Sequence, residues 1–173
     1  DGLRFAILTA ARSGEVRGAT WGEIDLERAV WTVPAARMKM RREHRVPLSP
    51  AAVDLLKGLP QQDGNPLVFP APRGKPLTDM AFTTLIRKMD AGEVAADRPG
   101  WRDPKAGDRV ATAHGIARSS FRDWAGDHTD HPREVIEAAL AHTLGAVEKA
   151  YRRGDAVEKR RALMNDWADY LNG

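Results

Sequence analysis

Apolar residues recur at helical spacing in several stretches of the chain, and each stretch begins at a residue suited to a helix N-terminus. Ser13, Ser49 and Thr78 are the expected caps, and Pro50 and Pro132 are expected at first helical positions. A short helix around Tyr151 is also expected, after a turn from His142 to Gly145. The other expected helices cover 2–10, 13 to about 19, 51–59, 79 to about 90, 112–124, 132–141 and 155–171.

A β region separates the first two helices from the third. Residues 30–34 and 44–48 are rich in β-branched and aromatic side chains and are bounded by turn residues, which predicts two paired strands. Residues 67–69 form a short apolar strand or link. We therefore expect a mainly helical α+β domain with a small antiparallel β-sheet or hairpin near residues 24–48.

In one segment, 91–109, the apolar residues follow neither a helical nor a strand spacing. It holds three glycines, two prolines and many charged residues, so it is expected to be the most flexible part of the chain.

Length and composition narrow the class of protein. A chain of 173 residues with 42% hydrophobic and 29% charged residues predicts one globular domain with its own core. The sequence has neither an apolar run of the roughly 18–20 residues needed to span a membrane nor a signal peptide. Cysteine is absent, which excludes disulfides and thiolate metal sites. The chain starts inside an expected helix, so we expect it to be a domain of a longer protein.

The net charge of +3 only hints at a polyanionic partner. Five basic residues cluster where the two predicted strands are connected. Such a tip could enter a groove of nucleic acid. Alternatively, its charges protect a sheet edge from aggregation. The five are Arg37, Lys39, Arg41, Arg42 and Arg45.

Arg12 precedes the second helix, where free backbone N–H groups favour anion binding. The alternative is a simple ion pair with Glu15. His114 and Arg118 are four residues apart on one expected helix, so they share a face. A lone histidine at such a position is more often a structural hydrogen-bonding group.

Tyr151 is one of two tyrosines and is flanked by Arg152 and Arg153, nine residues after His142. A phenol titrates near about 10 and is a poor nucleophile at neutral pH unless cations stabilise the phenolate. On its own, the stretch also fits a tyrosine solvated at the end of a helix.

Two patterns that suggest other chemistry are weak. The stretch 127–131 alternates acids and histidines but is better explained as a polar loop before a helix than as a metal site. Gly74 and Lys75 lack the surrounding residues of a phosphate-binding P-loop.

Taken together, these residues resemble the catalytic domain of tyrosine recombinases of the phage and prophage integrase type, over nearly the whole chain. Members of that family have an arginine in an R-x-G-E turn, a lysine in a β-hairpin before a V-P-L segment, a histidine–arginine helix, an L-[GA]-H turn and a nucleophilic tyrosine. The matching residues here are Arg12, Lys39, His114 with Arg118, His142 and Tyr151.

The chain departs from the family in one motif. The usual helix motif is H-x-x-R, whereas one more residue separates His114 from Arg118 here. Both spacings lie on one side of a helix. The following Ser-Ser-Phe-Arg-Asp-Trp aligns with Arg118 as the family's arginine, and Arg122 is the less favoured substitute.

The resemblance implies a chemistry without metal, nucleotide or other cofactor. Tyr151 would attack a DNA phosphate and form a 3′-phosphotyrosyl link, while Arg12 and Arg118 would bind the phosphate oxygens, a task for which planar guanidinium groups are suited. Lys39 would be the general acid, His114 would help take the tyrosine proton and His142 would bind the phosphate. Glu15 would orient Arg12. Expected DNA contacts are Arg37, Arg41, Arg42 and Arg152.

The resemblance also implies partners and a setting. These are double-stranded DNA attachment sites, a homotetramer on DNA, accessory DNA-bending proteins, further N-terminal DNA-binding domains, and the bacterial cytoplasm at the nucleoid. The expected function is integration or excision of a prophage or genomic island. A type IB topoisomerase-like activity and a non-catalytic DNA-binding remnant are the alternatives. We expect the last helix to pack in cis or on a neighbouring protomer.

Overall fold

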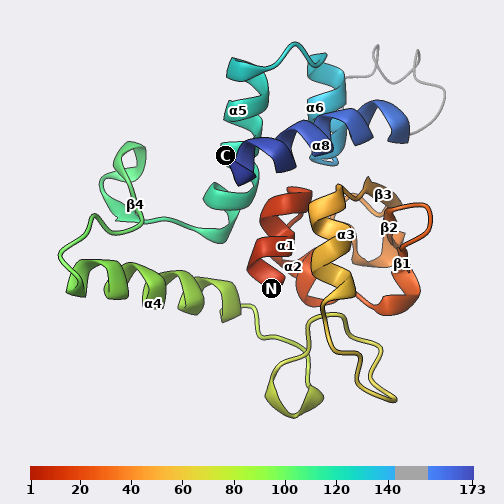
Figure 1. The fold of residues 1–173 in the computed structure, drawn as a ribbon, viewed down its shortest axis with the longest axis horizontal. Coiled ribbons are helices and arrows are strands. Elements are labelled where there is room, and N and C mark those ends of the chain that lie inside the picture. The colour runs from red at the N-terminus through yellow and green to blue at the C-terminus, as the bar shows by residue number, and fades with distance from the viewer. Residues whose placement is uncertain (143–155) are drawn as a thin grey trace.

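The computed structural model describes residues 1–142 and 156–173. These residues form helices in two groups, a small sheet and a projecting arm (Figure 1). The helices are α1 (Gly2–Thr9), α2 (Ser13–Arg17), α3 (Pro50–Lys57), α4 (Ala81–Ala95), α5 (Ser120–His128), α6 (Arg133–Ala139) and α8 (Val157–Asn172), with a π-helical turn at Gly115–Ser119. Short 3₁₀ turns lie at Trp21–Glu23, Ala35–Arg37, Pro72–Gly74 and Pro104–Ala106.

The predicted β region is a three-stranded antiparallel sheet in the order β1 (Ile24–Asp25), β2 (Val30–Val33) and β3 (His44–Pro47). Trp31 lies opposite Ile24 on one side and Val46 on the other. Phe5 of α1 packs against the Trp31 ring at 5.2 Å between centroids, so the sheet shares a core with α1 and α3. The small antiparallel sheet and the mainly helical α+β class are confirmed.

A second core lies between α5, α6 and α8. Phe121 and Trp124 of α5 pack around Trp167 of α8, and the Trp167 indole N–H donates to the Ile7 carbonyl of α1 at 2.8 Å. Ile7 packs against both cores, so α1 joins the two halves. Of the two positions expected for the last helix, the structure shows packing in cis, since α8 contacts α1, α3, α5, α6 and β3 of its own chain (Figure 1).

Several predicted boundaries were wrong. Arg12, not Ser13, occupies the cap of α2, and Met80, not Thr78, precedes α4. Pro132 is the cap of α6 rather than its first residue. By contrast, Ser49 caps α3 as predicted, and its hydroxyl accepts from the Ala52 N–H at 3.4 Å.

The segment predicted to be flexible contains regular structure. Helix α4 continues to Ala95, and β4 (Arg102–Asp103) pairs with β5 (Arg109–Val110). Buried Asp90 holds the two parts together, because it accepts from the Trp101 N–H at 2.9 Å and from Arg102 Nη2 at 3.0 Å. In Figure 1 this arm projects to the side of the two cores.

Candidate functional site

Arg118 is the centre of the site. Its residue surface is 3% exposed, and its guanidinium donates from Nη1 to the Ala10 carbonyl at 2.6 Å and from Nη2 to the Leu140 carbonyl at 2.7 Å. Ala10 ends α1 and Leu140 ends α6. The C-terminus of a helix has carbonyls without intrahelical partners and a partial negative charge, so each of these ends favours a cation. Two helix ends thus hold one buried positive charge.

Both helices end in the same local structure, with an alanine in the left-handed conformation. Ala10 has φ 48° and Ala141 has φ 51°. The next backbone N–H turns back to the helix, from Ala11 to the Ala6 carbonyl at 3.2 Å and from His142 to the Glu137 carbonyl at 2.9 Å. This Schellman turn favours a residue with little or no Cβ at the left-handed position, which gives the L-[GA]-H motif a physical reason. The two turns bring Arg12 and His142 to the helix ends bound by Arg118.

Arg12 lies at the N-terminus of α2 and also forms an ion pair with Glu15, so both alternatives predicted from the sequence are present. Its Nη1 donates to Glu15 Oε1 at 2.8 Å, and its backbone N–H donates to Glu15 Oε2 at 2.9 Å. Glu15 is 4% exposed, so its carboxylate holds Arg12 from inside the protein.

Electrostatic effects place four of the predicted side chains in one neighbourhood. Burial and the nearby charge of Arg12 lower the pKa of Arg118 to about 10. Burial also lowers the pKa of His114, and the positive charges of Arg118 and Arg12 add to that effect. Such repulsion requires proximity. Arg12, His114, Arg118 and His142 therefore lie near one another, in a region where the two arginines give an excess of positive charge.

The extra residue between His114 and Arg118 is absorbed by the π-helical turn Gly115–Ser119, in which the Ser120 N–H bonds to the Gly115 carbonyl. A π turn takes one more residue than an α turn. A turn closed by an i→i+5 bond has roughly 4.4 residues, so four residues across it rotate by about −30°, which is closer to the −60° of three α-helical residues than to the +40° of four. His114 and Arg118 thus keep nearly the orientation of an H-x-x-R pair.

His142 has a carboxylate partner that the sequence analysis did not identify. Its Nδ1 lies 2.6 Å from Glu137 Oε2, and the other oxygen, Oε1, accepts from Arg122 Nε at 3.1 Å. Arg118 Nη2 lies 3.1 Å from His142 Nε2. Arg122 therefore binds Glu137, whereas Arg118 binds the two helix ends, and the choice of Arg118 as the family's arginine stays a prediction. Glu137 precedes His142 by five residues, and that spacing alone does not predict a contact on a helix. The Schellman turn at the end of α6 brings the two residues together.

The basic connection between β2 and β3 divides into two groups. Lys39, Arg41 and Arg42 are exposed. Arg37 instead donates through Nε to Glu23 Oε1 at 3.1 Å and through Nη1 to the Glu15 carbonyl at 2.8 Å. A contact of Arg37 with DNA would require these bonds to break. Tyr151 and Arg152 lie in 143–155, outside the described residues.

His44 is a further residue that the sequence analysis missed. Its Nε2 lies 3.3 Å from the carbonyl of Ala139, in the last turn of α6. Burial, with the charge of Arg160, lowers the pKa of His44 to about 4. A neutral His44 therefore joins β3 to the helix that ends at the site.

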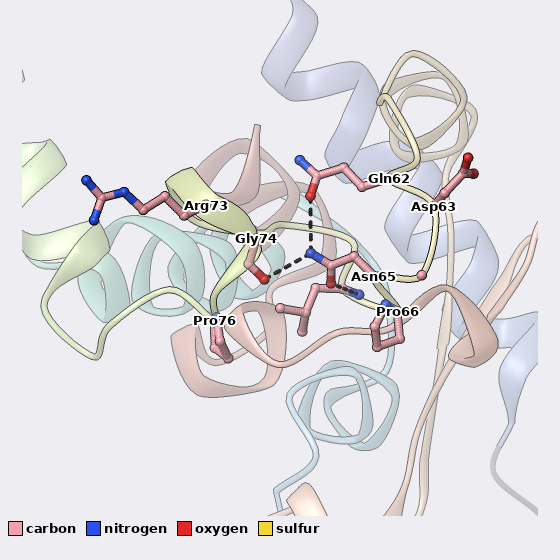
Figure 2. Close-up of a pocket in the computed structure, with 9 residues that line it drawn as sticks. Gln62, Asp63, Asn65, Pro66, Arg73, Gly74 and Pro76 are labelled. Carbon is pink, nitrogen blue, oxygen red and sulfur yellow. Dashed lines mark hydrogen bonds between the residues drawn. The ribbon is translucent and has the colours of Figure 1, made fainter.

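A cavity of about 730 Å³ lies away from this cluster, in the loop after α3 (Figure 2). Asn65 supports it from within, donating to Gln62 Oε1 at 3.2 Å and to the Gly74 carbonyl at 2.9 Å, and accepting from the Leu67 N–H at 3.1 Å. The side chain of Arg73 extends away from Asn65 in Figure 2. Because the Asn65 amide is used to hold the loop, we assign this cavity a structural origin.

The described residues contain no cluster of His, Cys, Asp or Glu that could hold a metal ion. Within the polar loop at 127–131, His131 Nε2 pairs with Asp166 of α8 at 2.6 Å. Among the helices in the described part of the chain, none is long and apolar enough to cross a membrane.

Comparison with known proteins assigns the family. The sequence profile of the phage integrase family matches residues 2–153. The chain belongs to the phage integrase family. Relatives include the prophage integrases IntA and IntZ of Escherichia coli K12, with 38% identity over 169 residues and 34% over 172, and the integrase of Enterobacteria phage P4, with 31% over 187.

The integrase domain described here covers 96–98% of its own length in these matches but only 37–39% of the relatives' length. Solved structures of similar fold include the Tn1549 transposon integrase in complex with circular intermediate DNA, with a TM-score of 0.60 and 15% identity over 94% of this chain and 56% of that one. The XerA recombinase gives a TM-score of 0.56 and 17% identity over 100% of this chain and 59% of that one. The expected recombinase fold is confirmed.

Proposed function

We propose that this chain is the catalytic domain of a site-specific recombinase, which integrates or excises a prophage or genomic island by cutting and rejoining double-stranded DNA. The family and the prophage integrases among its relatives support this proposal. The observation that carries it is the common positive region of Arg12, His114, Arg118 and His142.

That region suits a phosphodiester for an electrostatic reason. The buried guanidinium of Arg118 is held by neutral carbonyls, and its lowered pKa reflects burial together with the repulsion of Arg12. The Arg118 Nε–H has no hydrogen-bond partner among the described residues. An anion between the two arginines would relieve their repulsion, and charge that develops on non-bridging oxygens would strengthen the interaction.

The reaction that we propose conserves bond energy. The Tyr151 phenolic oxygen forms a bond to phosphorus while the bond from phosphorus to the 5′-oxygen breaks, which leaves a 3′-phosphotyrosyl link. His114 helps take the phenolic proton, and Lys39 protonates the departing 5′-oxygen. Arg12, Arg118 and His142 bind the phosphate oxygens, with Glu15 holding Arg12. Reversal with a new 5′-hydroxyl rejoins the strand without a cofactor.

Partners and setting are part of the same proposal. Exposed Arg41 and Arg42, together with Arg152, would contact the DNA backbone, as would Arg37 if it leaves Glu23. The relatives are longer than this chain, so we propose N-terminal DNA-binding domains in the full protein, a homotetramer on paired attachment sites, and accessory DNA-bending proteins. The protein would act on bacterial DNA in the cytoplasm, at the nucleoid.

The test is a nicked suicide DNA substrate that carries a candidate attachment site, incubated with the full-length protein. We expect a covalent protein–DNA adduct from the unmodified protein and none from Tyr151→Phe, because the phenylalanine ring has no nucleophilic oxygen. Tyr170→Phe is the matched control and should form the adduct normally. Tyr170 stacks on Trp124 and Trp167 at the far end of α8.

Two outcomes would contradict the proposal. DNA binding without an adduct from the unmodified protein would favour a non-catalytic binding module. An adduct that persists in Tyr151→Phe and disappears in Tyr170→Phe would show that the nucleophile is Tyr170.

A further inference from the structure

We propose that Glu137 is a positioning residue that fixes the proton arrangement of the His142 imidazole, and that Arg122 holds Glu137 for this task. This proposal concerns His142 and rests on the proposed function for its link to DNA cleavage. Its structural part can be measured independently.

The hydrogen-bonding partners determine which nitrogen of His142 carries the proton. An arginine nitrogen can only donate, so His142 Nε2, at 3.1 Å from Arg118 Nη2, must be the acceptor. The ring proton is then on Nδ1, which donates to Glu137 Oε2 at 2.6 Å. A carboxylate on one ring nitrogen generally sets the tautomer presented by the other.

Glu137 is held on both sides. One oxygen accepts from His142 and the other from Arg122 Nε at 3.1 Å. The Glu137 side chain is 13% exposed, and hydrogen bonds from His142 and Arg122 lower the pKa of its carboxyl despite its burial. The group is therefore an anion at neutral pH. The backbone gives a second link, because the His142 N–H donates to the Glu137 carbonyl at 2.9 Å.

This arrangement has a chemical consequence at the opposite ring nitrogen. Since Nδ1 already carries a proton, a second proton from solvent can bind only at Nε2, and only once the Arg118 N–H no longer donates to that nitrogen. The resulting imidazolium could donate from Nε2 to a phosphate oxygen, while the negative charge of Glu137 stabilises its positive charge. Without Glu137 the 3.1 Å contact with Arg118 is the one hydrogen bond to the ring that remains among the described residues, and we expect it to be too weak alone to prevent the ring from turning over or adopting the other tautomer.

The first measurement is the tautomer of His142 by ¹⁵N NMR of the purified chain. We expect the Nδ1–H form to dominate in the unmodified protein and the Nε2–H form to rise in Glu137→Ala. Glu137→Gln retains an oxygen that can accept from Nδ1–H, so it should keep the Nδ1–H form. Glu134→Ala is the matched control, because it removes an acid from an exposed position on the same helix.

The second measurement is adduct formation on the suicide substrate. Loss of a carboxylate that orients a metal-bound histidine costs on the order of 10- to 100-fold, and we expect a similar factor for this metal-free histidine, so Glu137→Ala should slow cleavage by about that factor without a matching loss of DNA affinity. Glu137→Gln should lie between Glu137→Ala and the unmodified protein, and Arg122→Ala should have a smaller effect than Glu137→Ala.

Results that overturn the proposal are distinct from failure of the recombinase assignment. If Glu137→Ala keeps the Nδ1–H tautomer, or cleaves as fast as Glu134→Ala, Glu137 does not position His142. If the unmodified protein forms no adduct, the proposed function fails, and the tautomer measurement still decides whether Glu137 controls the ring.

Discussion

Arg118 shows at the scale of single residues how a buried charge is tolerated. Among the described residues its hydrogen-bonding partners are two main-chain carbonyls and one imidazole nitrogen, with no carboxylate at that distance. A fully paired ion would attract a phosphate weakly, because its charge would already be neutralised. Binding by helix ends keeps the guanidinium in place and leaves its net charge available to a ligand.

His44 provides a prediction for pH dependence. Its pKa is lowered from 6.5 to about 4 in the folded state, so the unfolded chain binds a proton first as the pH falls. Folding stability should therefore be complete above about pH 6.5 and decrease from there to about pH 4, by up to about 3 kcal/mol from this group. Urea unfolding at several pH values measures the effect.

Two variants separate His44 from other titrating groups. His44→Gln should flatten the decrease between pH 6.5 and 4, because glutamine does not titrate there. His128→Gln, at an exposed position at the end of α5, should leave the decrease unchanged. An equal decrease in His44→Gln would show that the pH dependence arises elsewhere.

The site residues could be predicted from the sequence to different degrees. Arg12, His114, Arg118 and His142 were identified from motif order, because each motif is local and readable. Glu137 was missed because its contact with His142 depends on the Schellman turn at the end of α6. His44 was missed because its contact depends on the packing of β3 against α6, which is distant in the sequence. The roles of all these residues in catalysis stay predictions.

At the scale of elements, the turn before α5 shows how an insertion can be accommodated. A regular α-helix with one added residue would rotate everything beyond it by about 100°. The π-helical turn Gly115–Ser119 takes up the residue locally, so Phe121 and Trp124 still face their core. π turns are rare and occur mostly as single turns inside α-helices, frequently at functional sites.

This explanation predicts the effect of a deletion. Removal of Gly115 should convert the π turn into an α turn, restore the H-x-x-R spacing and keep a folded protein that forms the DNA adduct. Circular dichroism melting and the suicide substrate measure both properties.

Deletion of Asp123 is the control for that prediction, since it removes a residue from regular helix. It should rotate Trp124 by about 100° out of its core and unfold the protein at lower temperature. If both deletions are equally harmful, the extra residue is not absorbed by the π turn alone.

The ends of helices were predicted correctly from the sequence where a strong capping motif was present. Ser49 and Pro50 together marked the start of α3 correctly. The start of α2 was misjudged because Glu15 bonds to the Arg12 backbone, so the arginine serves as the cap. The length of α4 was misjudged because Asp90 is stabilised by Trp101 and Arg102, which no local pattern reveals.

At the scale of the whole molecule, α8 closes the structure by packing along both cores. Trp167 is 2% exposed and is in contact with Phe121, Trp124 and Tyr170. Arg160 of the same helix donates to the Arg45 carbonyl at 2.6 Å, which ties the C-terminal helix to β3. The helix thus links the two halves that each supply part of the site.

Trp167 should therefore contribute strongly to stability. Trp167→Ala removes a buried indole and its bond to Ile7, and should lower the free energy of unfolding by about 3–5 kcal/mol. Urea unfolding of the purified chain measures the change. Tyr170→Ala is the control on the same helix, and should have a small effect because Tyr170 is 59% exposed. Equal effects would mean that α8 does not depend on this buried contact.

The sequence alone determined the class of fold, the order of most elements and the motifs that led to the family, because caps, periodicity and short motifs act over a few residues. Tertiary structure alone decided that two helix ends converge on Arg118, that Glu137 and Arg122 lie behind His142, and that His44 is buried. These relations join residues up to about a hundred positions apart, as between Ala10 and Arg118. Such contacts arise from packing of whole elements, and no local pattern in the chain encodes them.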